Sequence, residues 1–329
     1  MPILRWVLAA FNAITWPGYV TCVTIAAVSA PYLPAAVRAT ALGVGARAWL
    51  DELPDRLDRL AAQWDFTIGR AYEDATEAYV APVTLGDGTA AVLKLLVPRG
   101  GDRVTEEVTA LRLAGGDPCV RLLRASADAM LLERLGPAMA GAGLPFPERL
   151  AILTGLAQRV WRPAAGSGLP TGADRARRLL AVIPARWEQL GRPCSARTVA
   201  HALACAERRM TAHRADRAVL NHGDVHQWNA LRTADGRGWR LVDPDGLLAE
   251  PECDLGVLMR EDPDELPAGD PQERARWLAA RTGRDATAIW EWGVAGRVAT
   301  GLTLTAIGLQ PVASRMLAAA DGISAAYPS

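Results

Sequence analysis

The chain has 329 residues, of which 36 are Lys or Arg and 36 are Asp or Glu, so its formal net charge at pH 7 is zero. This length is sufficient for two lobes with separate cores. The balanced charge excludes the strongly basic character of proteins that are steered toward nucleic acid, and we expect no nucleic-acid partner. The five cysteines form no C-x-x-C pair. They argue against a disulfide framework or a zinc site and favour buried thiols in a reducing cytoplasm.

An apolar extension is predicted at residues 1–33. Residues 6–30 contain no charged side chain and are long enough to span a bilayer, but Pro17-Gly18 interrupts them. A signal peptide is disfavoured because Pro31 directly follows the Ala-Val-Ser-Ala site and would block cleavage. A membrane tether, a poorly ordered extension and a start site assigned too far upstream stay open. We favour the last two, so membrane association is not favoured.

Residues 34–64 have apolar side chains near helical spacing and predict a helix that packs on a first lobe. Residues 66–98 then change to the two-residue period of strands, with a hairpin turn at residues 86–88. The second predicted strand, at residues 90–96, carries Lys94 among apolar residues.

Lys94 is costly to bury unless its ammonium group meets an anion. The expected anions are a nucleotide phosphate and a glutamate of the following helix, with Glu107 preferred over its neighbour Glu106. The other interpretation is a lysine on an edge strand whose ammonium group reaches water.

The loop between the first two strands, residues 72–78, differs from usual phosphate-covering loops. Those loops contain glycines, so that backbone N–H groups can approach the phosphates. Here no glycine occurs, and Glu73, Asp74 and Glu77 would repel a triphosphate unless they point away from it. A protein that binds a nucleotide without catalysing a reaction therefore stays open as an alternative to an enzyme.

Residues 120–123 and 129–132 predict the last strands of the first lobe. Helices follow at residues 147–161, 173–189 and 195–213, with a glycine-rich loop at residues 163–172 between the first two.

Residues 219–246 are predicted to form strand, loop, strand, tight turn and strand, which gathers His222, Asp224, Asn229 and Asp243 at one end. Phosphoryl transfer needs a carboxylate that orients the attacking hydroxyl group, and oxygen ligands for Mg²⁺. Asp-x-x-x-x-Asn followed by a strand-end Asp supplies them in the order of kinases. Asp224 is the predicted base, and Asn229 and Asp243 are the predicted metal ligands. His222 is expected to fix the loop by hydrogen bonding.

These motifs resemble a known family. His222-Gly223-Asp224-Val225-His226-x-x-Asn229 resembles the catalytic loop of aminoglycoside phosphotransferases, and Asp243-Pro244 resembles their Mg²⁺-binding strand end. Residues 250–258 and 290–302 are similar to the branch that contains streptomycin 6-phosphotransferases and hydroxyurea-type phosphotransferases. The resemblance covers about residues 34 to 325.

The resemblance implies a two-lobed, protein-kinase-like α+β fold with ATP and Mg²⁺ as cofactors. A small mixed β lobe would occupy residues 34–135, and an α-rich catalytic and acceptor-binding lobe would occupy residues 136–329. Lys94, paired with Glu107, would bind the nucleotide phosphates. Glu133 and Leu135 would lie in a hinge that binds the adenine edge. Asp254 would brace the catalytic loop by accepting backbone N–H groups.

The predicted function is ATP-dependent transfer of the γ-phosphoryl group to a hydroxyl group of a small antibiotic-like molecule, which would inactivate it. A streptomycin-type acceptor is favoured, and an endogenous metabolite stays open. No Ala-Pro-Glu activation segment follows Asp243, which argues against a protein kinase. Ten acidic residues between Leu241 and Asp270 predict either a site for a cationic acceptor or a solvated face. We expect a monomer.

Further helices are predicted at residues 254–260, 272–281, 286–306 and 312–321. Three tryptophans on these segments predict core positions, with a wall for a sugar-like ligand as the minority interpretation: Trp277, Trp290 and Trp292.

Overall fold

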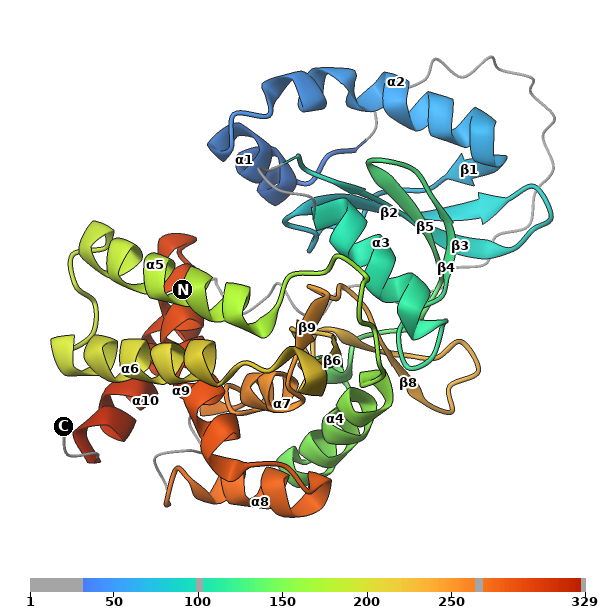
Figure 1. The fold of residues 1–329 in the computed structure, drawn as a ribbon. Helices are drawn as coiled ribbons and strands as arrows, with labels where there is room; N and C mark the ends of the chain where they lie inside the picture. Colours follow the sequence, from blue (N-terminus) through green and yellow to red (C-terminus); the bar gives the residue numbers. More distant parts are fainter. Residues whose placement is uncertain (1–31, 99–102, 264–268, 327–329) are drawn as a thin grey trace, which may run out of the picture. The chain divides into compact units, whose positions relative to one another are not determined.

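The computed structural model describes residues 32–98, 103–263 and 269–326, which form a small lobe and a larger helical lobe (Figure 1). The small lobe contains α1 (Ala35–Gly43), α2 (Arg47–Trp64), β1 (Phe66–Ile68), β2 (Ala78–Leu85), β3 (Ala90–Leu96), α3 (Arg103–Ala114), β4 (Leu122–Ala125) and β5 (Ala129–Glu133). Its strands form one antiparallel sheet in the order β1-β2-β3-β5-β4.

The two faces of this sheet have different partners. Leu93 of β3 and Leu131 of β5 belong to the core that α1 and α2 cover, while Met130 belongs to the core that includes α3. Figure 1 shows α2 and α3 on opposite sides of the sheet. Lys94 pairs with Met130 across the strands, so it points to the same face as Met130. The two-residue period therefore directs Lys94 toward α3 and away from α2.

Residues 34–64 pack on the small lobe as their spacing predicted, but they form two helices rather than one. The helical conformation is interrupted between α1 and α2. Gly45 in this segment has a φ of 75°, a conformation that glycine adopts without steric cost. The α2 helix then buries one stripe against the sheet: Trp49, Leu53, Leu57, Leu60 and Trp64.

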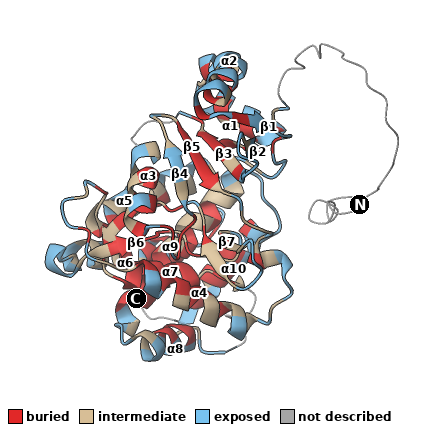
Figure 2. Cartoon of the chain, turned by 90° about the vertical axis from the view of Figure 1, so that its right-hand side faces the viewer, coloured by how far each residue is buried: buried red, intermediate tan, exposed pale blue. Residues whose placement is uncertain are grey.

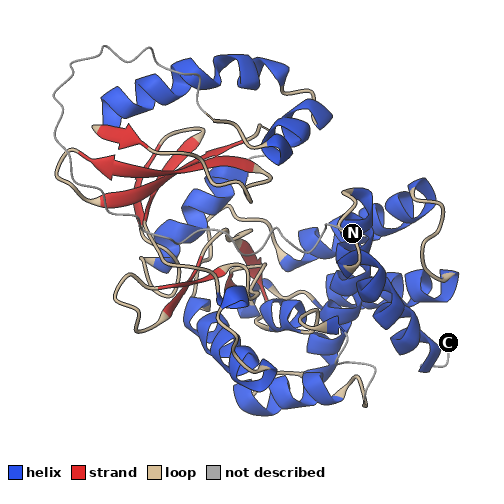
Figure 3. Ribbon diagram, turned by 180° about the vertical axis from the view of Figure 1, so that it is seen from behind, coloured by secondary structure: helices blue, strands red, loops and turns tan. Residues whose placement is uncertain are grey.

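The larger lobe consists mainly of helices, with two small pairs of strands near the small lobe (Figure 3). Its elements are η1 (Met139–Gly141), α4 (Phe146–Val160), α5 (Gly172–Gln189), α6 (Ala196–Ala212), η2 (Ala215–Arg217), β6 (Val219–Asn221), β7 (Ala230–Arg232), β8 (Trp239–Leu241), β9 (Leu247–Ala249), α7 (Glu252–Leu258), α8 (Glu273–Thr282), α9 (Ala286–Ala306) and α10 (Val312–Ala326). The β7 strand pairs with β8, and β6 pairs with β9.

The α7 and α9 helices pack closely at the centre of the larger lobe, where most residues are buried (Figure 2). A Cβ atom on Gly256 would lie 2.3 Å from the Trp292 Cβ, and one on Gly293 would lie 2.5 Å from the Met259 Cβ. Glycine at these positions therefore lets the two helices approach. Trp290 and Trp292 are buried, as predicted for core residues, whereas Trp277 is 37% exposed.

Four cysteines are buried free thiols, as predicted: Cys119, Cys194, Cys205 and Cys253. Cys22 and most of the predicted extension at residues 1–33 lie outside the described residues. Within residues 32–98, 103–263 and 269–326, no helix has the length and apolarity needed to cross a membrane. The lobe boundary at residues 135 and 136 stays a prediction.

Candidate active site

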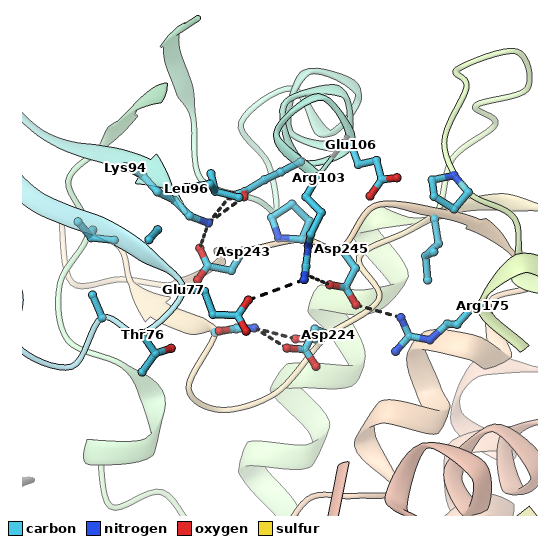
Figure 4. A pocket seen from close by; sticks show the side chains of 18 of the residues that line it. Thr76, Glu77, Lys94, Leu96, Arg103, Glu106, Arg175, Asp224, Asp243 and Asp245 are labelled. Carbon is cyan, nitrogen blue, oxygen red and sulfur yellow. Dashed lines mark hydrogen bonds and ion pairs between the residues drawn. The ribbon is translucent and has the colours of Figure 1, made fainter. Parts of the chain in front are cut away.

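A pocket of about 500 Å³ is lined by residues of β2, β3 and α3 in the small lobe, and by α5 and the loop that carries Asp224 and Asn229 in the larger lobe (Figure 4). Lys94, Glu107, Asp224, Asn229 and Asp243 all line it. The structure thus brings together five of the residues that the sequence singled out, although they are spread over 150 positions of the chain (94–243).

Lys94 is 7% exposed, and its Nζ atom donates to both carboxylate oxygens of Glu107, at 2.7 and 2.8 Å. It also donates to Asp243 Oδ1 at 2.9 Å. Burial lowers the Lys94 pKa, but the charges of Asp243 and Glu107 outweigh this effect and raise the pKa above its ordinary value. Lys94 is therefore a charged ammonium group held by Glu107, and the edge-strand interpretation does not apply.

Asp254, which is fully buried, braces the loop that carries Asp224. Its carboxylate accepts the backbone N–H groups of His222 at 3.1 Å and Gly223 at 2.7 Å, and the indole N–H of Trp161 at 3.1 Å. Burial raises the Asp254 pKa to about 6, while these donors favour the charged form. Asp254 therefore occupies the bracing position that the resemblance implies.

His222 is fully buried and fixes the loop through its ring. Its Nδ1 atom accepts the backbone N–H of Asp224 at 3.2 Å, and its Nε2 atom lies 3.0 Å from the Val242 carbonyl oxygen. The proton therefore belongs on Nε2, which donates to Val242. Burial lowers the His222 pKa to about 4, so this histidine is neutral near pH 7.

Gly223 cannot be replaced without strain. It has a φ of 87°, and a Cβ atom there would lie 2.8 Å from the Asp245 Cβ. We expect Gly223→Ala to lower the free energy of unfolding by about 2–3 kcal/mol. Gly236→Ala is the matched control, because Gly236 has a φ of 71° and a Cβ atom there would meet nothing within 4 Å. Equal losses in the two variants, measured by denaturant unfolding, would contradict the role of the contact with Asp245.

Two basic side chains, to which the sequence assigned no role, contact the Asp224 carboxylate. Arg260 Nη2 donates to Asp224 Oδ1 at 2.9 Å, and His226 Nε2 lies 3.0 Å from Asp224 Oδ2. Asn229 Nδ2 also donates to Oδ2, at 3.2 Å. Burial raises the Asp224 pKa, but His226 and Arg260 outweigh it and hold the pKa far below its ordinary range. Asp224 is therefore a carboxylate with a fixed orientation.

The interaction between His226 and Asp224 depends on pH. Burial lowers its pKa, but the Asp224 charge outweighs burial and raises the pKa above the value of the unfolded chain, about 6.5. The pair therefore stabilises the fold fully below about pH 6.5 and loses this contribution as the pH rises through the raised pKa. We expect His226→Gln to cost about 1 kcal/mol near pH 6 and clearly less near pH 9. The free energy of unfolding of both proteins at each pH measures this, and a constant difference would contradict it.

Asp243 and Asn229 supply oxygen atoms of the kind that Mg²⁺ prefers. Asp243 has a φ of 58°, a left-handed conformation that few residues other than glycine adopt, so the backbone is held in an unusual state at this position. In the described part of the chain, no group of three or more His, Cys, Asp or Glu side chains could hold a metal ion by itself. Mg²⁺ takes one or two protein ligands and completes its shell with water and phosphates, and Asn229 and Asp243 are the candidate ligands here.

Glu133 and Leu135 are not among the described residues that line the pocket. The Glu133 carboxylate accepts the backbone N–H of Arg121 at 2.9 Å and pairs with the side chains of Arg121 and Arg240. Its side chain is therefore occupied within the small lobe and β8. The predicted contact with adenine would use backbone groups of this segment, and it stays a prediction.

The acidic stretch after Leu241 contributes only Asp243 and Asp245 to the described lining of the pocket. Its other described carboxylates have structural partners. Glu250 pairs with Arg209 and accepts from the Trp292 indole, Asp262 pairs with Arg149, and Asp270 pairs with Arg276. These carboxylates hold the larger lobe together, and Asp264 and Glu265 lie outside the described residues.

Comparison with known proteins shows similarity to a family model and to named relatives. The family model described as aminoglycoside/hydroxyurea antibiotic resistance kinase matches residues 64–294. A streptomycin 6-kinase from Streptomyces glaucescens is 32% identical over 224 residues, which are 67% of this chain and 71% of the relative. A hydroxyurea phosphotransferase from Kitasatospora aureofaciens is 33% identical over 220 residues, which are 65% of this chain and 62% of the relative.

Among solved structures, a thermostable mutant of aminoglycoside phosphotransferase APH(4)-Ia, in ternary complex with ADP and hygromycin B, matches with a TM-score of 0.56. The match covers 82% of this chain and 99% of that chain at 15% sequence identity. At this identity the similarity concerns the fold, and it confirms the two-lobed kinase-like architecture that the sequence predicted.

Proposed function

Because the chain belongs to the aminoglycoside/hydroxyurea antibiotic resistance kinase family, we propose that it transfers the γ-phosphoryl group of ATP to a hydroxyl group of a small antibiotic-like molecule. Membership confirms the resemblance predicted from the sequence and the predicted enzyme class, a phosphotransferase with an alcohol group as acceptor. The nucleotide, the acceptor and the resulting inactivation are the parts that we propose.

One observation carries the proposal: Lys94, Asp224, Asn229 and Asp243 line the same pocket. Bound Mg-ATP would supply the phosphoryl group and the metal charge that stabilises it. Asp224, held in place by Arg260 and His226, would orient the acceptor hydroxyl group and accept its proton. Asn229 and Asp243 would hold the metal ion, and Lys94 would bind the phosphates while Glu107 fixes its position.

Streptomycin is the first acceptor that we propose, because one similar protein is named a streptomycin 6-kinase. The acidic stretch does not strengthen this choice, since Glu250, Asp262 and Asp270 pair with arginines and do not line the pocket. Hydroxyurea and endogenous hydroxyl compounds therefore belong in the same panel.

The test is turnover of Mg-ATP with streptomycin, other aminoglycosides and hydroxyurea, with phosphorylated product identified by mass spectrometry. Phosphorylated streptomycin would support the full proposal. Phosphorylation of another compound would keep the reaction and replace the acceptor. If nucleotide binds but no compound is phosphorylated, the alternative of a non-catalytic nucleotide-binding protein gains support. If Mg-ATP does not bind, the proposed function fails.

A further inference from the structure

The covering loop, residues 72–78, places carboxylates beside the proposed phosphate site. Asp74 and Glu77 of this loop line the pocket, together with five other carboxylates of the described residues: Glu106, Glu107, Asp224, Asp243 and Asp245. The loop has no glycine through which backbone N–H groups could approach a phosphate. A triphosphate in this pocket therefore needs a cation near the covering loop.

Among the described residues, four cationic side chains line the pocket: Lys94, Arg103, Arg175 and Arg178. Lys94 donates to Glu107 and Asp243, and the proposed function already assigns it to the phosphates. Arg175 is fixed to the larger lobe, since it donates to Asp245 Oδ2 at 2.9 Å and to the Gly223 carbonyl oxygen at 3.0 Å. Arg178 follows it on α5, in the lobe that does not contain the covering loop.

Arg103 has a different position. It is the first residue of α3, and Figure 4 shows its side chain reaching into the pocket, with the guanidinium group between Glu77 and Asp245. Its Nη1 atom lies 3.8 Å from Glu77 Oε2, and its Nη2 atom lies 3.4 Å from Asp245 Oδ1. Arg103 thus links the covering loop to the segment that carries Asp243.

The contacts of Arg103 are weak enough to be exchanged for a phosphate. Both are longer than the 2.7–2.9 Å typical of strong charge-assisted hydrogen bonds, and 44% of the side chain is exposed. A guanidinium group can donate two parallel hydrogen bonds to a phosphate. Lys94 contacts Asp243, whereas Arg103 contacts Asp245, two residues further along the chain and beside Arg175. Arg103 therefore lies on the Asp245 side of the pocket, whereas Lys94 lies on the Asp243 side.

We propose that Arg103 binds the terminal phosphate of the nucleotide and takes the part that backbone N–H groups play in a glycine-containing covering loop. Glu77 holds the guanidinium group over the pocket before the nucleotide binds. The inference rests on the proposed function, because it requires the nucleotide to occupy this pocket.

Binding of Mg²⁺-AMP-PNP and Mg²⁺-ADP to the full chain, measured by calorimetry, tests the inference. We expect Arg103→Gln to weaken AMP-PNP binding roughly tenfold. ADP binding should weaken less than about twofold, because ADP lacks the γ-phosphate that Arg103 would contact. Arg70→Gln is the matched control. Arg70 pairs with Glu73 of the same loop at 2.8 Å and is not among the described residues that line the pocket, so we expect both affinities to be unchanged.

A second variant separates contact from charge balance. If Arg103 only neutralises Glu77, then Arg103→Gln/Glu77→Gln would bind AMP-PNP as the unaltered protein does, and the inference would be overturned. A tenfold loss that persists in the double variant supports direct contact with the phosphate. Unchanged AMP-PNP binding in Arg103→Gln would overturn the inference and leave the proposed function intact. Failure of the unaltered protein to bind either nucleotide would overturn both.

Discussion

Asp224→Asn should lower phosphoryl transfer at least about a hundredfold while nucleotide binding changes little. The substitution preserves the size of the side chain and removes the charge that would accept the proton of the acceptor. Asparagine keeps one oxygen that can accept from Arg260, so the loss would reflect the missing charge more than a displaced side chain. Single-turnover rates at saturating nucleotide and acceptor measure the effect.

The control for Asp224→Asn is the affinity for Mg²⁺-AMP-PNP. The pocket residues that would hold the nucleotide are Lys94, Asn229 and Asp243, and Asn229 loses only one of its two hydrogen bonds to residue 224, since the other goes to the backbone carbonyl oxygen. Affinity should therefore stay within about threefold. A variant that binds nucleotide and retains more than a tenth of the rate would remove Asp224 from the role of base.

Asp254→Ala should lower the free energy of unfolding by about 3–5 kcal/mol at pH 7.5. The Asp254 carboxylate is fully buried and accepts three N–H groups, from His222, Gly223 and Trp161. Its pKa of about 6 leaves it ionised at this pH. Alanine would leave the three N–H donors buried without an acceptor. Each unsatisfied buried donor lowers the free energy of unfolding by about 1–3 kcal/mol.

Denaturant unfolding of Asp254→Ala beside Asp254→Asn separates two contributions. Asparagine keeps one acceptor oxygen, so it should lose less than alanine, although its amide nitrogen would face one of the backbone donors. Asp174 provides a surface comparison, because its carboxylate accepts the backbone N–H of the N-cap residue Thr171 at 3.0 Å, and Asp174→Ala should cost only about 1 kcal/mol. A loss below about 1 kcal/mol for Asp254→Ala would show that the loop does not depend on this carboxylate.

Local elements were predictable where one pattern extended over many residues. The helix predicted at residues 286–306 matches α9, which begins after the N-cap Asp285, and Lys94 was assigned correctly to a buried strand beside Glu107. The break between α1 and α2 was missed, because the apolar spacing continues across Gly45 and only the backbone conformation ends the helix there.

The partners that tune the site were not predictable in the same way. Arg260 lies 36 residues after Asp224 and reaches it because α7 folds back beneath the catalytic loop. No local spacing connects these residues. His226 lies two residues after Asp224, so its position was known, but its role depends on a side-chain direction that sequence patterns do not fix. The acidic stretch was ambiguous for a similar reason, since the arginines that pair with it come from α4, α6 and α8.

Any shortened version of the protein has to keep α1 and α2, although the family match begins only at residue 64. These helices cover the face of the sheet opposite Lys94, where Val37, Ala41, Trp49 and Leu53 are at most 4% exposed. Trimming the chain to the matched residues would open this face to water as a contiguous apolar surface, which promotes association between molecules. The limits of the recognisable family and the limits of the unit that folds are therefore different.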